Sequence, residues 1–226
     1  MAKGIWGVLI ADVVRSRSTP GLRSLLSSKL RTATRTHLAQ KRIRLPYAVT
    51  AGDEFQTIAA ELSAVPGLVF DLRRQLRPIQ LRIGIGIGPI PGRLRPPVNQ
   101  LGGPAFQMAR QAIEETKSGR AHRFEAYTAF RSANRDFDRI ANLVYGLHDA
   151  LVWNLTEKQW QAIDAYVSRR RVDLAARALR VSVSTASRSL KRGHFWHIEE
   201  TIDSMAKIIL RAFPHLHESV QNSLIA

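Results

Sequence analysis

The chain has 226 residues, of which 45% are hydrophobic and 23% charged; this is the balance of one large or two small globular domains and excludes a disordered chain. Its 34 Lys and Arg against 18 Asp and Glu give a formal net charge of +16, so DNA or a nucleotide is the first partner to expect. The alternative, a general preference for Arg at surface positions, stays open.

Cysteine is absent, which excludes disulfides, thiolate metal sites and a Cys nucleophile, and suits a reducing cytoplasm. The N-terminal apolar run is too short for a signal peptide, and no apolar stretch is long enough to span a membrane. We therefore expect a cytoplasmic protein with no membrane partner.

The first half of the sequence alternates between strand-like and helical patterns. An apolar run broken only by Asp12 is typical of a buried central strand, and Ser18-Thr19-Pro20 supplies a helix N-cap. In chain order we expect a strand at 5–14, a helix to about 40, a hairpin at 46–58, a helix at about 62–76, a strand at 80–88, a helix at 105–116, a further strand at 122–127 and a mostly helical segment at about 134–152.

Two glycine-containing stretches mark this half. Gly52-Asp53-Glu54 forms the tip of the expected hairpin, where a rigid carboxylate pair suits a metal or another cation better than core packing. The plain alternative is that these are ordinary turn residues. From Gly84 to Gly88 every second residue is Gly, alternating with Ile, so one face of that strand is bare. Either a packed helix or a ligand must lie close to this face.

The second half has a helical pattern throughout. Thr156-Glu157-Lys158-Gln159 is a capping box that begins the first helix. We expect helices at 157–168, 172–179, 184–192 and about 197–212.

Two of these helices, joined by a tight turn at 180–182, resemble a helix-turn-helix in which Val181 and Val183 fill the turn and Leu190 docks the second helix. Hydroxyls and cations at the outward positions suit DNA bases and phosphates. The predicted DNA-binding residues are Ser184, Thr185, Ser187, Arg188, Lys191 and Arg192. A protein-interaction or dimerisation scaffold has the same geometry and remains the alternative.

The order of motifs in the first half, from ADVV through AGDEF and IGIGIG to GGPAFQMAR, resembles the palm domain of class III nucleotidyl cyclases and diguanylate cyclases. The resemblance implies that Asp12 and Asp53 hold two divalent metal ions, Mg²⁺ or Mn²⁺, with Glu54 as a third ligand. It also implies phosphate contacts from basic residues around the site. The candidates for these contacts are Arg15, Arg17, Lys117 and Arg120.

The palm resemblance departs from the cyclases at the residues that stabilise the transition state. Class III cyclases have an Asn and an Arg four residues apart on the later helix, and aligning Arg110 with that Arg puts Phe106 at the Asn. The candidate catalytic residues are therefore Asp12, Asp53 and Arg110, and whether catalysis is retained stays open.

Over residues 5–195 the chain is similar to members of the SatD-like family, which share the Asp strand, the GDEFQ hairpin, the GxGxG strand, the GPAF helix and a helix-turn-helix after a W…T…QW segment. We expect an α+β fold with a ferredoxin-like palm domain at 1–150 and an all-α helix-turn-helix domain at 151–226. Palm cyclases assemble their sites across a dimer, so a homodimer is expected, and its two helix-turn-helix units would suit a palindromic DNA site.

Three functions are compatible with these patterns. The first is a DNA-binding regulator whose palm domain senses a nucleotide with a divalent metal. The second is an active nucleotidyl cyclase or oligonucleotide synthase that uses Asp12 and Asp53 with two metals. The third is a catalytically dead palm dimer that acts as a protein-binding adaptor.

Overall fold

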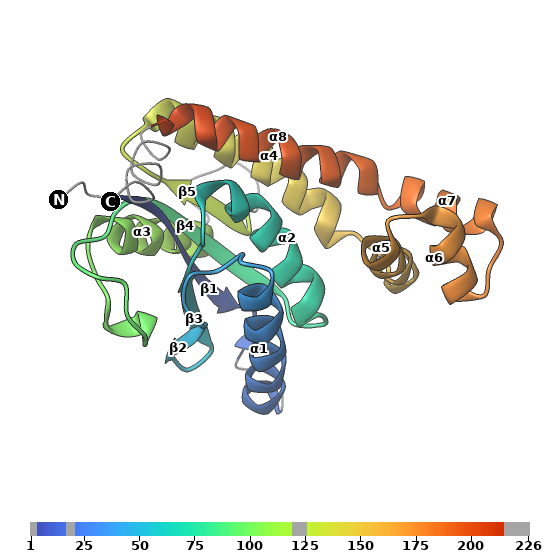
Figure 1. Cartoon of the computed structure of the whole chain (residues 1–226), viewed down its shortest axis with the longest axis horizontal. Coiled ribbons are helices and arrows are strands. Elements are labelled where there is room, and N and C mark those ends of the chain that lie inside the picture. The colour runs from blue at the N-terminus through green and yellow to red at the C-terminus, as the bar shows by residue number, and fades with distance from the viewer. Residues whose placement is uncertain (1–3, 17–20, 119–125, 215–226) are drawn as a thin grey trace, which may run out of the picture.

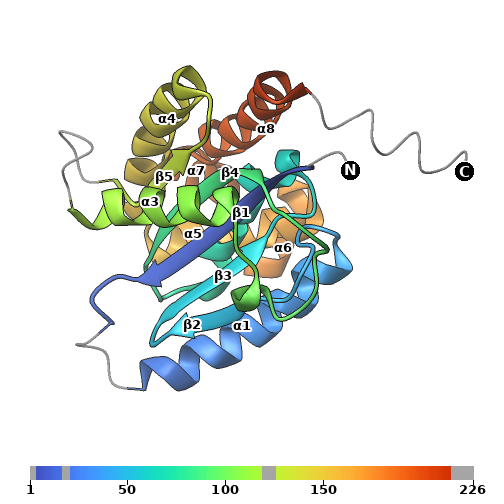
Figure 2. The same cartoon turned by 90° about the vertical axis from the view of Figure 1, so that its left-hand side faces the viewer.

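A computed structural model of the chain describes residues 4–16, 21–118 and 126–214, and it has the mixed α+β architecture that the sequence predicts. One five-stranded sheet forms its centre, with the strand order β2-β3-β1-β4-β5 (Figure 2). β1 pairs antiparallel with both β3 and β4, whereas β4 and β5 are parallel. The strands are β1 (Ile5–Val13), β2 (Ala48–Ala51), β3 (Glu54–Ile58), β4 (Leu81–Pro89) and β5 (Thr128–Arg131).

Helices cover both faces of the sheet, and further helices lie together at one end of the molecule (Figure 1). The helices of the first half are α1 (Leu22–Ala39), α2 (Val65–Leu76), α3 (Pro104–Ser118) and α4 (Arg135–Trp153). Those of the second half are α5 (Glu157–Arg169), α6 (Val172–Leu179), α7 (Val183–Arg192) and α8 (Phe195–Ala212). None of the helices in the described ranges combines the length and the apolarity that crossing a membrane requires.

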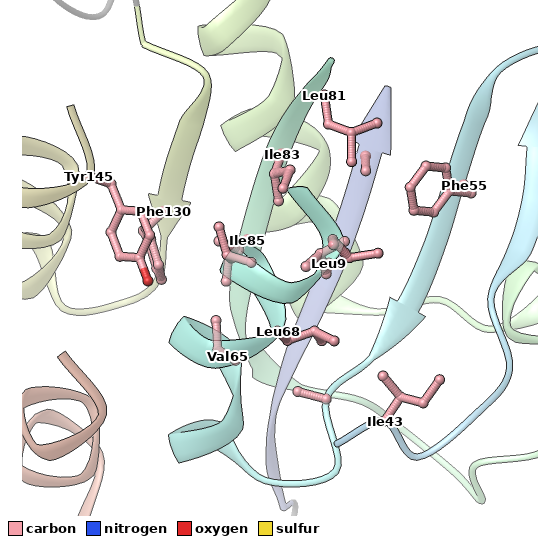
Figure 3. Close-up of a cluster of buried hydrophobic side chains, with 14 of the residues drawn as sticks. Leu9, Ile43, Phe55, Val65, Leu68, Leu81, Ile83, Ile85, Phe130 and Tyr145 are labelled. Carbon is pink, nitrogen blue, oxygen red and sulfur yellow. The ribbon is translucent and has the colours of Figure 1, made fainter. Parts of the chain in front are cut away.

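The alternation of side chains along β1 divides the core into two layers. Leu9, Ala11 and Val13 belong to the larger cluster, to which α1, α2, α4 and α8 also contribute (Figure 3). Val8 and Ile10 belong to a smaller cluster with α3. Since successive strand residues point to opposite faces, Asp12 lies on the α3 face of the sheet.

The bare face of β4 is covered by a helix. A Cβ added to Gly86 would lie 2.0 Å from the carbonyl oxygen of Ala105 and 2.3 Å from the amide nitrogen of Ala109. At Gly84 it would lie 2.4 Å from the amide nitrogen of Ile113. Of the two predicted neighbours, helix or ligand, the helix is therefore correct, and the glycines bring α3 into direct contact with the sheet.

The second half joins the first through aromatic packing and through α8. Phe70 of α2 stacks on Trp160 of α5 with 5.9 Å between ring centroids, and Phe195 packs against the same Phe70. From this end α8 runs back beside α4 to the larger core cluster, where Met205 and Ile209 are buried (Figure 1). The predicted domain boundary at 150/151 falls within α4 and stays a prediction.

Most predicted elements have the observed type, and the differences are local. The strand expected at 122–127 is β5, which begins only at Thr128, and part of the expected range lies outside the described residues. The expected N-cap at residues 18–20 also lies outside them. The helix expected from residue 62 begins as a 3₁₀ turn, and α2 itself starts at Val65 with Pro66 in its first turn.

Candidate functional site

Asp12 and Asp53 come together at one end of the sheet. Asp12 lies near the end of β1, and Ala11 pairs with Phe55 of β3, which brings the β2–β3 turn alongside. Gly52 has φ +63° in this turn, a conformation that favours glycine. Oδ2 of Asp53 is buried and has no hydrogen-bond partner among the described residues. The pKa of Asp12 is raised, first by burial and further by the Asp53 carboxyl, although Lys117 opposes the rise.

Glu54 is held by an arginine from the opposite side of the site. Both guanidinium Nη atoms of Arg110 donate to the two carboxylate oxygens of Glu54, one of them at 2.6 Å, and Thr50 donates to Oε1 at 2.8 Å. Burial alone would raise the pKa of Glu54. The hydrogen bonds from Arg110 and Thr50 outweigh burial and, with the charges of Arg110 and Lys117, lower that pKa. Glu54, predicted as a third metal ligand, is thus already paired with Arg110 and Thr50, and its role as a ligand stays a prediction.

Lys117 connects the two groups of carboxylates. Its Nζ lies 3.3 Å from Oδ2 of Asp12, 3.4 Å from Oε1 of Glu114 and 3.9 Å from Oε2 of Glu54. Burial alone would lower the pKa of Lys117, but the Asp12 and Glu114 carboxylates outweigh it and raise that pKa. Lys117, a candidate for phosphate contact, therefore lies at the site as a fully charged ammonium group.

Of the other three predicted phosphate contacts, Arg15 lies within the described residues. It follows β1, has φ +56° and is exposed. Arg17 and Arg120 lie outside the described residues. Beside Asp53 is an open depression of about 660 Å³. Its lining residues are Ser16, Gly21, Leu22, Arg23, Ser24, Gly52 and Asp53.

Two residues of the site were missed by reading the sequence. Arg82 lies opposite Asp12 in the β1–β4 register, on the α3 face, and its Nε is buried without a hydrogen-bond partner in the described ranges. Its signal was available, because Arg82 has the same parity in β4 as Gly84 and must share its face. Thr50 gave no such signal, since it lies where the β2–β3 register shifts, between Val49, which pairs with Phe55, and Ala51, which pairs with Glu54.

The donors at Asp12 and Asp53 suit a hard divalent cation that arrives with a ligand. Within the described parts of the chain, no three His, Cys, Asp or Glu side chains gather as a metal cage. Mg²⁺ commonly uses only one or two protein carboxylates and completes its shell with water and substrate phosphates. The unpartnered Oδ2 of Asp53 beside Asp12 fits this mode.

Helix α7 presents all of its predicted DNA-binding side chains to solvent. Ser184, Thr185, Ser187, Arg188, Lys191 and Arg192 are all exposed. Ser182 caps α7 by accepting from the backbone amide of Thr185, and its hydroxyl lies 2.9 Å from that of Ser184. Arg188, Lys191 and Arg192 make no ion pair with any other described residue.

The predicted plug of the turn between α6 and α7 is wrong. Val181 and Val183 are 41% and 52% exposed, whereas Leu190 is buried as predicted. The two helices approach through small residues, Ala176 of α6 and Ala186 of α7, both nearly inaccessible. The turn itself therefore contributes little to the packing between the two helices.

The model of the SatD family matches residues 7–191 of the sequence, from the third residue of β1 to the penultimate residue of α7. No curated protein matches the sequence.

Proposed function

The chain belongs to the SatD family, and we propose that this member is a DNA-binding regulator whose sheet domain senses a nucleotide together with Mg²⁺ or Mn²⁺. The order of elements supports a palm-type domain. Strands β2-β3-β1-β4 are antiparallel to their neighbours, with α1 between β1 and β2 and α2 between β3 and β4. This is the βαββαβ pattern of a ferredoxin-like unit.

The single observation that carries the nucleotide proposal is the Asp12–Asp53 pair, with one buried, unpartnered carboxylate oxygen on Asp53. A bound divalent ion would give that oxygen a partner and remove the repulsion between the two carboxylates. Lys117 and Arg82 are the nearby cations that would contact the phosphates of the ligand. The metal itself would supply neutralisation of phosphate charge.

We propose sensing rather than turnover, because Arg110 is committed to Glu54. Both of its Nη atoms are used in that pair, so the guanidinium is not free to stabilise a transferring phosphoryl group. Incubation with labelled ATP, GTP, CTP and UTP plus Mn²⁺ tests this point. The proposal expects no product, and product that disappears in Asp53→Asn would replace sensing by catalysis.

The DNA-binding part of the proposal is supported by the exposed cations of α7 and by the overall charge of +16. Cations without an internal partner are available for backbone phosphates, and short hydroxyls near the start of α7 suit base edges. In a homodimer two such helices would contact two half-sites.

Thermal unfolding with a panel of nucleoside triphosphates, each with and without Mn²⁺, tests the sensing site. A ligand that binds the native state raises the midpoint by mass action, so one nucleotide with Mn²⁺ should raise it while Mn²⁺ alone does so less. Asp53→Asn should lose the shift, and Asp136→Asn, which removes an exposed carboxylate at the start of α4, should keep it. No shift with any nucleotide, or equal shifts in wild type and Asp53→Asn, would refute the proposal.

A second candidate, a protein-binding adaptor, is favoured by the exposed valines at the α6–α7 turn. Two neighbouring apolar side chains in water suit contact with an apolar partner surface. Asp substitutions at the two valines separate the two functions, because Val183 is the first residue of α7 and Val181 lies in the turn before it. A DNA-binding α7 predicts a larger loss of DNA affinity in Val183→Asp than in Val181→Asp. Equal losses of DNA affinity, together with loss of a co-purifying partner protein in both variants, would favour the adaptor.

A further inference from the structure

Helix α4 has one line of residues that is exposed to solvent along its whole length. These residues, which we call the α4 seam, follow one another at alternating steps of four and three positions: Asp136, Ile140, Leu143, Leu147, Ala150 and the C-cap Asn154. Ile140 is 50% exposed, Leu143 58% and Leu147 65%. The two leucines are the most exposed large apolar side chains of the described residues, so the fold leaves an apolar line in water.

The spacing of the seam is that of a helix which packs against another helix. Steps of four and three place side chains on one line, as at the contact positions of a coiled coil. The opposite side of α4 is already used within the chain, because Phe137, Ala141 and Tyr145 are buried in the larger core cluster. Figure 2 shows α4 at the edge of the molecule, where a helix from outside the chain can approach it.

The seam reads the same in both directions, which favours a second copy of this chain over a different protein. Its members lie in pairs at equal distances on either side of residue 145: Leu143 and Leu147, Ile140 and Ala150, Asp136 and Asn154. In an antiparallel pair of α4 helices the leucines therefore face each other, each isoleucine faces the smaller alanine, and the polar ends meet. A two-fold interface needs such a self-complementary surface.

The charges beside the seam are also complementary in an antiparallel pair. Helix α8 runs beside α4 in the opposite direction, and Phe213 at its end packs on Phe137 near the start of α4 with 5.1 Å between ring centroids. At this end of the two helices the exposed cations are Arg135, Arg139, Lys207 and Arg211. Towards its other end α8 has the exposed carboxylates of Glu200 and Asp203. Antiparallel pairing brings the basic end of each protomer to the acidic end of its partner.

We propose that the α4 seam is a homodimer interface, in which the α4 helices of two copies of this chain pack antiparallel about a two-fold axis near residue 145. Contact through one helix flanked by α8 is smaller than the standard interface of about 800 Å² per partner, so we expect a dissociation constant of about 1–50 µM.

This interface leaves each carboxylate site within one protomer. Helix α4 packs with the larger core cluster, whereas Asp12 lies on the α3 face of the sheet. The arrangement differs from that of the palm cyclases, whose sites are assembled across the dimer. The inference needs neither a nucleotide nor DNA, so its outcome is separate from that of the proposed function.

Sedimentation of the full-length chain at concentrations from about 1 to 200 µM tests the interface, and the wild type should change from monomer to dimer over this range. Leu143→Glu places a carboxylate at the centre of the seam in both copies and should raise the dissociation constant at least about tenfold. Leu25→Glu makes the same change at an exposed leucine of α1 and should leave it unchanged. Since both leucines are exposed, the unfolding midpoint of the dilute monomer should stay the same in both variants, which separates loss of contact from loss of fold.

The direction of the pairing can be tested with introduced thiols, because the chain has no Cys. In an antiparallel pair, residue 140 of one protomer faces residue 150 of its partner, while the two copies of residue 140 are ten positions, or about 15 Å, apart along the helix axis. A mixture of the single variants Ile140→Cys and Ala150→Cys should therefore form a mixed disulfide on oxidation, and either variant alone should form little.

Three outcomes would overturn the proposal. A wild-type chain that stays monomeric at about 200 µM would leave the seam to a helix of another protein. Association as strong in Leu143→Glu as in wild type, or weakened equally in Leu25→Glu, would place the contact elsewhere. Disulfides that form as readily in Ile140→Cys alone as in the mixture would show that the helices do not pair antiparallel.

Discussion

The carboxylate site and core of the sheet body differ from helix α7 in how their positive charges are paired. Three cations of the site and core have carboxylate partners: Arg110 with Glu54, Lys117 with Asp12, and Arg73 with Asp149. On α7, Arg188, Lys191 and Arg192 are exposed and form no ion pair with a described residue. These cations of the site and the core are therefore neutralised by neighbouring carboxylates, whereas the three cations of α7, at the far end of the molecule, are not (Figure 1).

This difference indicates two kinds of partner. The site around Asp12, Asp53 and Lys117 is prearranged, and Oδ2 of Asp53 has no partner among the described residues. Such a site suits one compact divalent cation together with the phosphates that the cation binds. A row of solvated cations on one helix attracts an extended polyanion by charge, and its contacts weaken steeply with salt. If this contrast is correct, removing a carboxylate partner in the sheet body should destabilise the fold, and removing unpaired cations from α7 should weaken DNA binding.

The largest expected effect concerns the buried pair in the sheet body. Asp149→Ala leaves Arg73 buried without its carboxylate and should lower the free energy of unfolding by about 3–5 kcal/mol. Asp164→Ala removes a carboxylate that is 35% exposed, and should cost about 1 kcal/mol or less. Urea denaturation of both variants measures the contrast, and equal losses would show that burial does not distinguish these pairs.

The same pair predicts a pH dependence. Burial would raise the pKa of Asp149, but the charge of Arg73 and the hydrogen bond from Thr128 outweigh it and lower that pKa. Its stabilising contribution is therefore complete above the ordinary value of 3.8 and is lost as the pH falls through the lowered pKa. The difference between wild type and Asp149→Ala should stay constant from pH 7 to pH 5 and narrow only in stronger acid.

A slightly smaller effect is expected where α3 meets the sheet. Gly86→Ala forces a Cβ into backbone atoms of Ala105 and Ala109, so α3 must move, at a cost of about 1–3 kcal/mol. Gly88→Ala is the matched control, because its Cβ comes no closer than 3.3 Å to any atom. Since α3 carries Arg110 and Lys117, Gly86→Ala should also weaken the nucleotide-dependent rise in midpoint. A stable Gly86→Ala protein with full nucleotide response would contradict the packing account.

On α7, Arg188→Ala combined with Lys191→Ala should weaken binding to duplex DNA about tenfold at low salt, or about 1.4 kcal/mol. The slope of log affinity against log salt should fall by about 2 as two phosphate contacts are lost. Arg31→Ala with Arg35→Ala removes the same charge from exposed positions on α1 and should have a much smaller effect. Equal losses of DNA affinity in the two double variants would show that DNA binding depends on net charge alone.

The smallest effect has the opposite sign. The raised pKa of Asp12 means that its charged form is disfavoured by folding, so Asp12→Asn should stabilise the metal-free protein at pH 7, by less than about 1 kcal/mol. The gain should disappear as the pH falls below the ordinary value of 3.8, where Asp12 is protonated in both states. Destabilisation at pH 7 would show instead that the ion pair with Lys117 dominates.

Local signals in the sequence predicted the second half well. The Thr156–Gln159 capping box is present with both of its reciprocal bonds, and α6 has the predicted bounds. These features depend on neighbours within one helical turn. The start of β5 was missed because Thr128 pairs in parallel with Ile83, a contact across 45 residues that no local pattern encodes.

The candidate site was predictable in its carboxylates and in two of its cations, Lys117 and Arg110, but not in how these cations pair. Asp12 and Asp53 follow from strand and turn positions, and the structure brings them together, while their role as metal ligands stays a prediction. The Arg110–Glu54 pair joins residues 56 positions apart, and it depends on how closely the glycines of β4 admit α3. The separation between α3 and the sheet results from tertiary packing, and the spacing of residues in the sequence does not predict it.

Coupling between the two regions is the central claim, and one titration tests it most directly. Binding of a fluorescent DNA duplex is measured by anisotropy with and without Mn²⁺ and the nucleotide that raises the unfolding midpoint most. The account predicts that the ligand changes DNA affinity at least about fivefold in wild type, and that Asp53→Asn binds DNA but no longer responds. DNA affinity that is identical with and without bound nucleotide would contradict it.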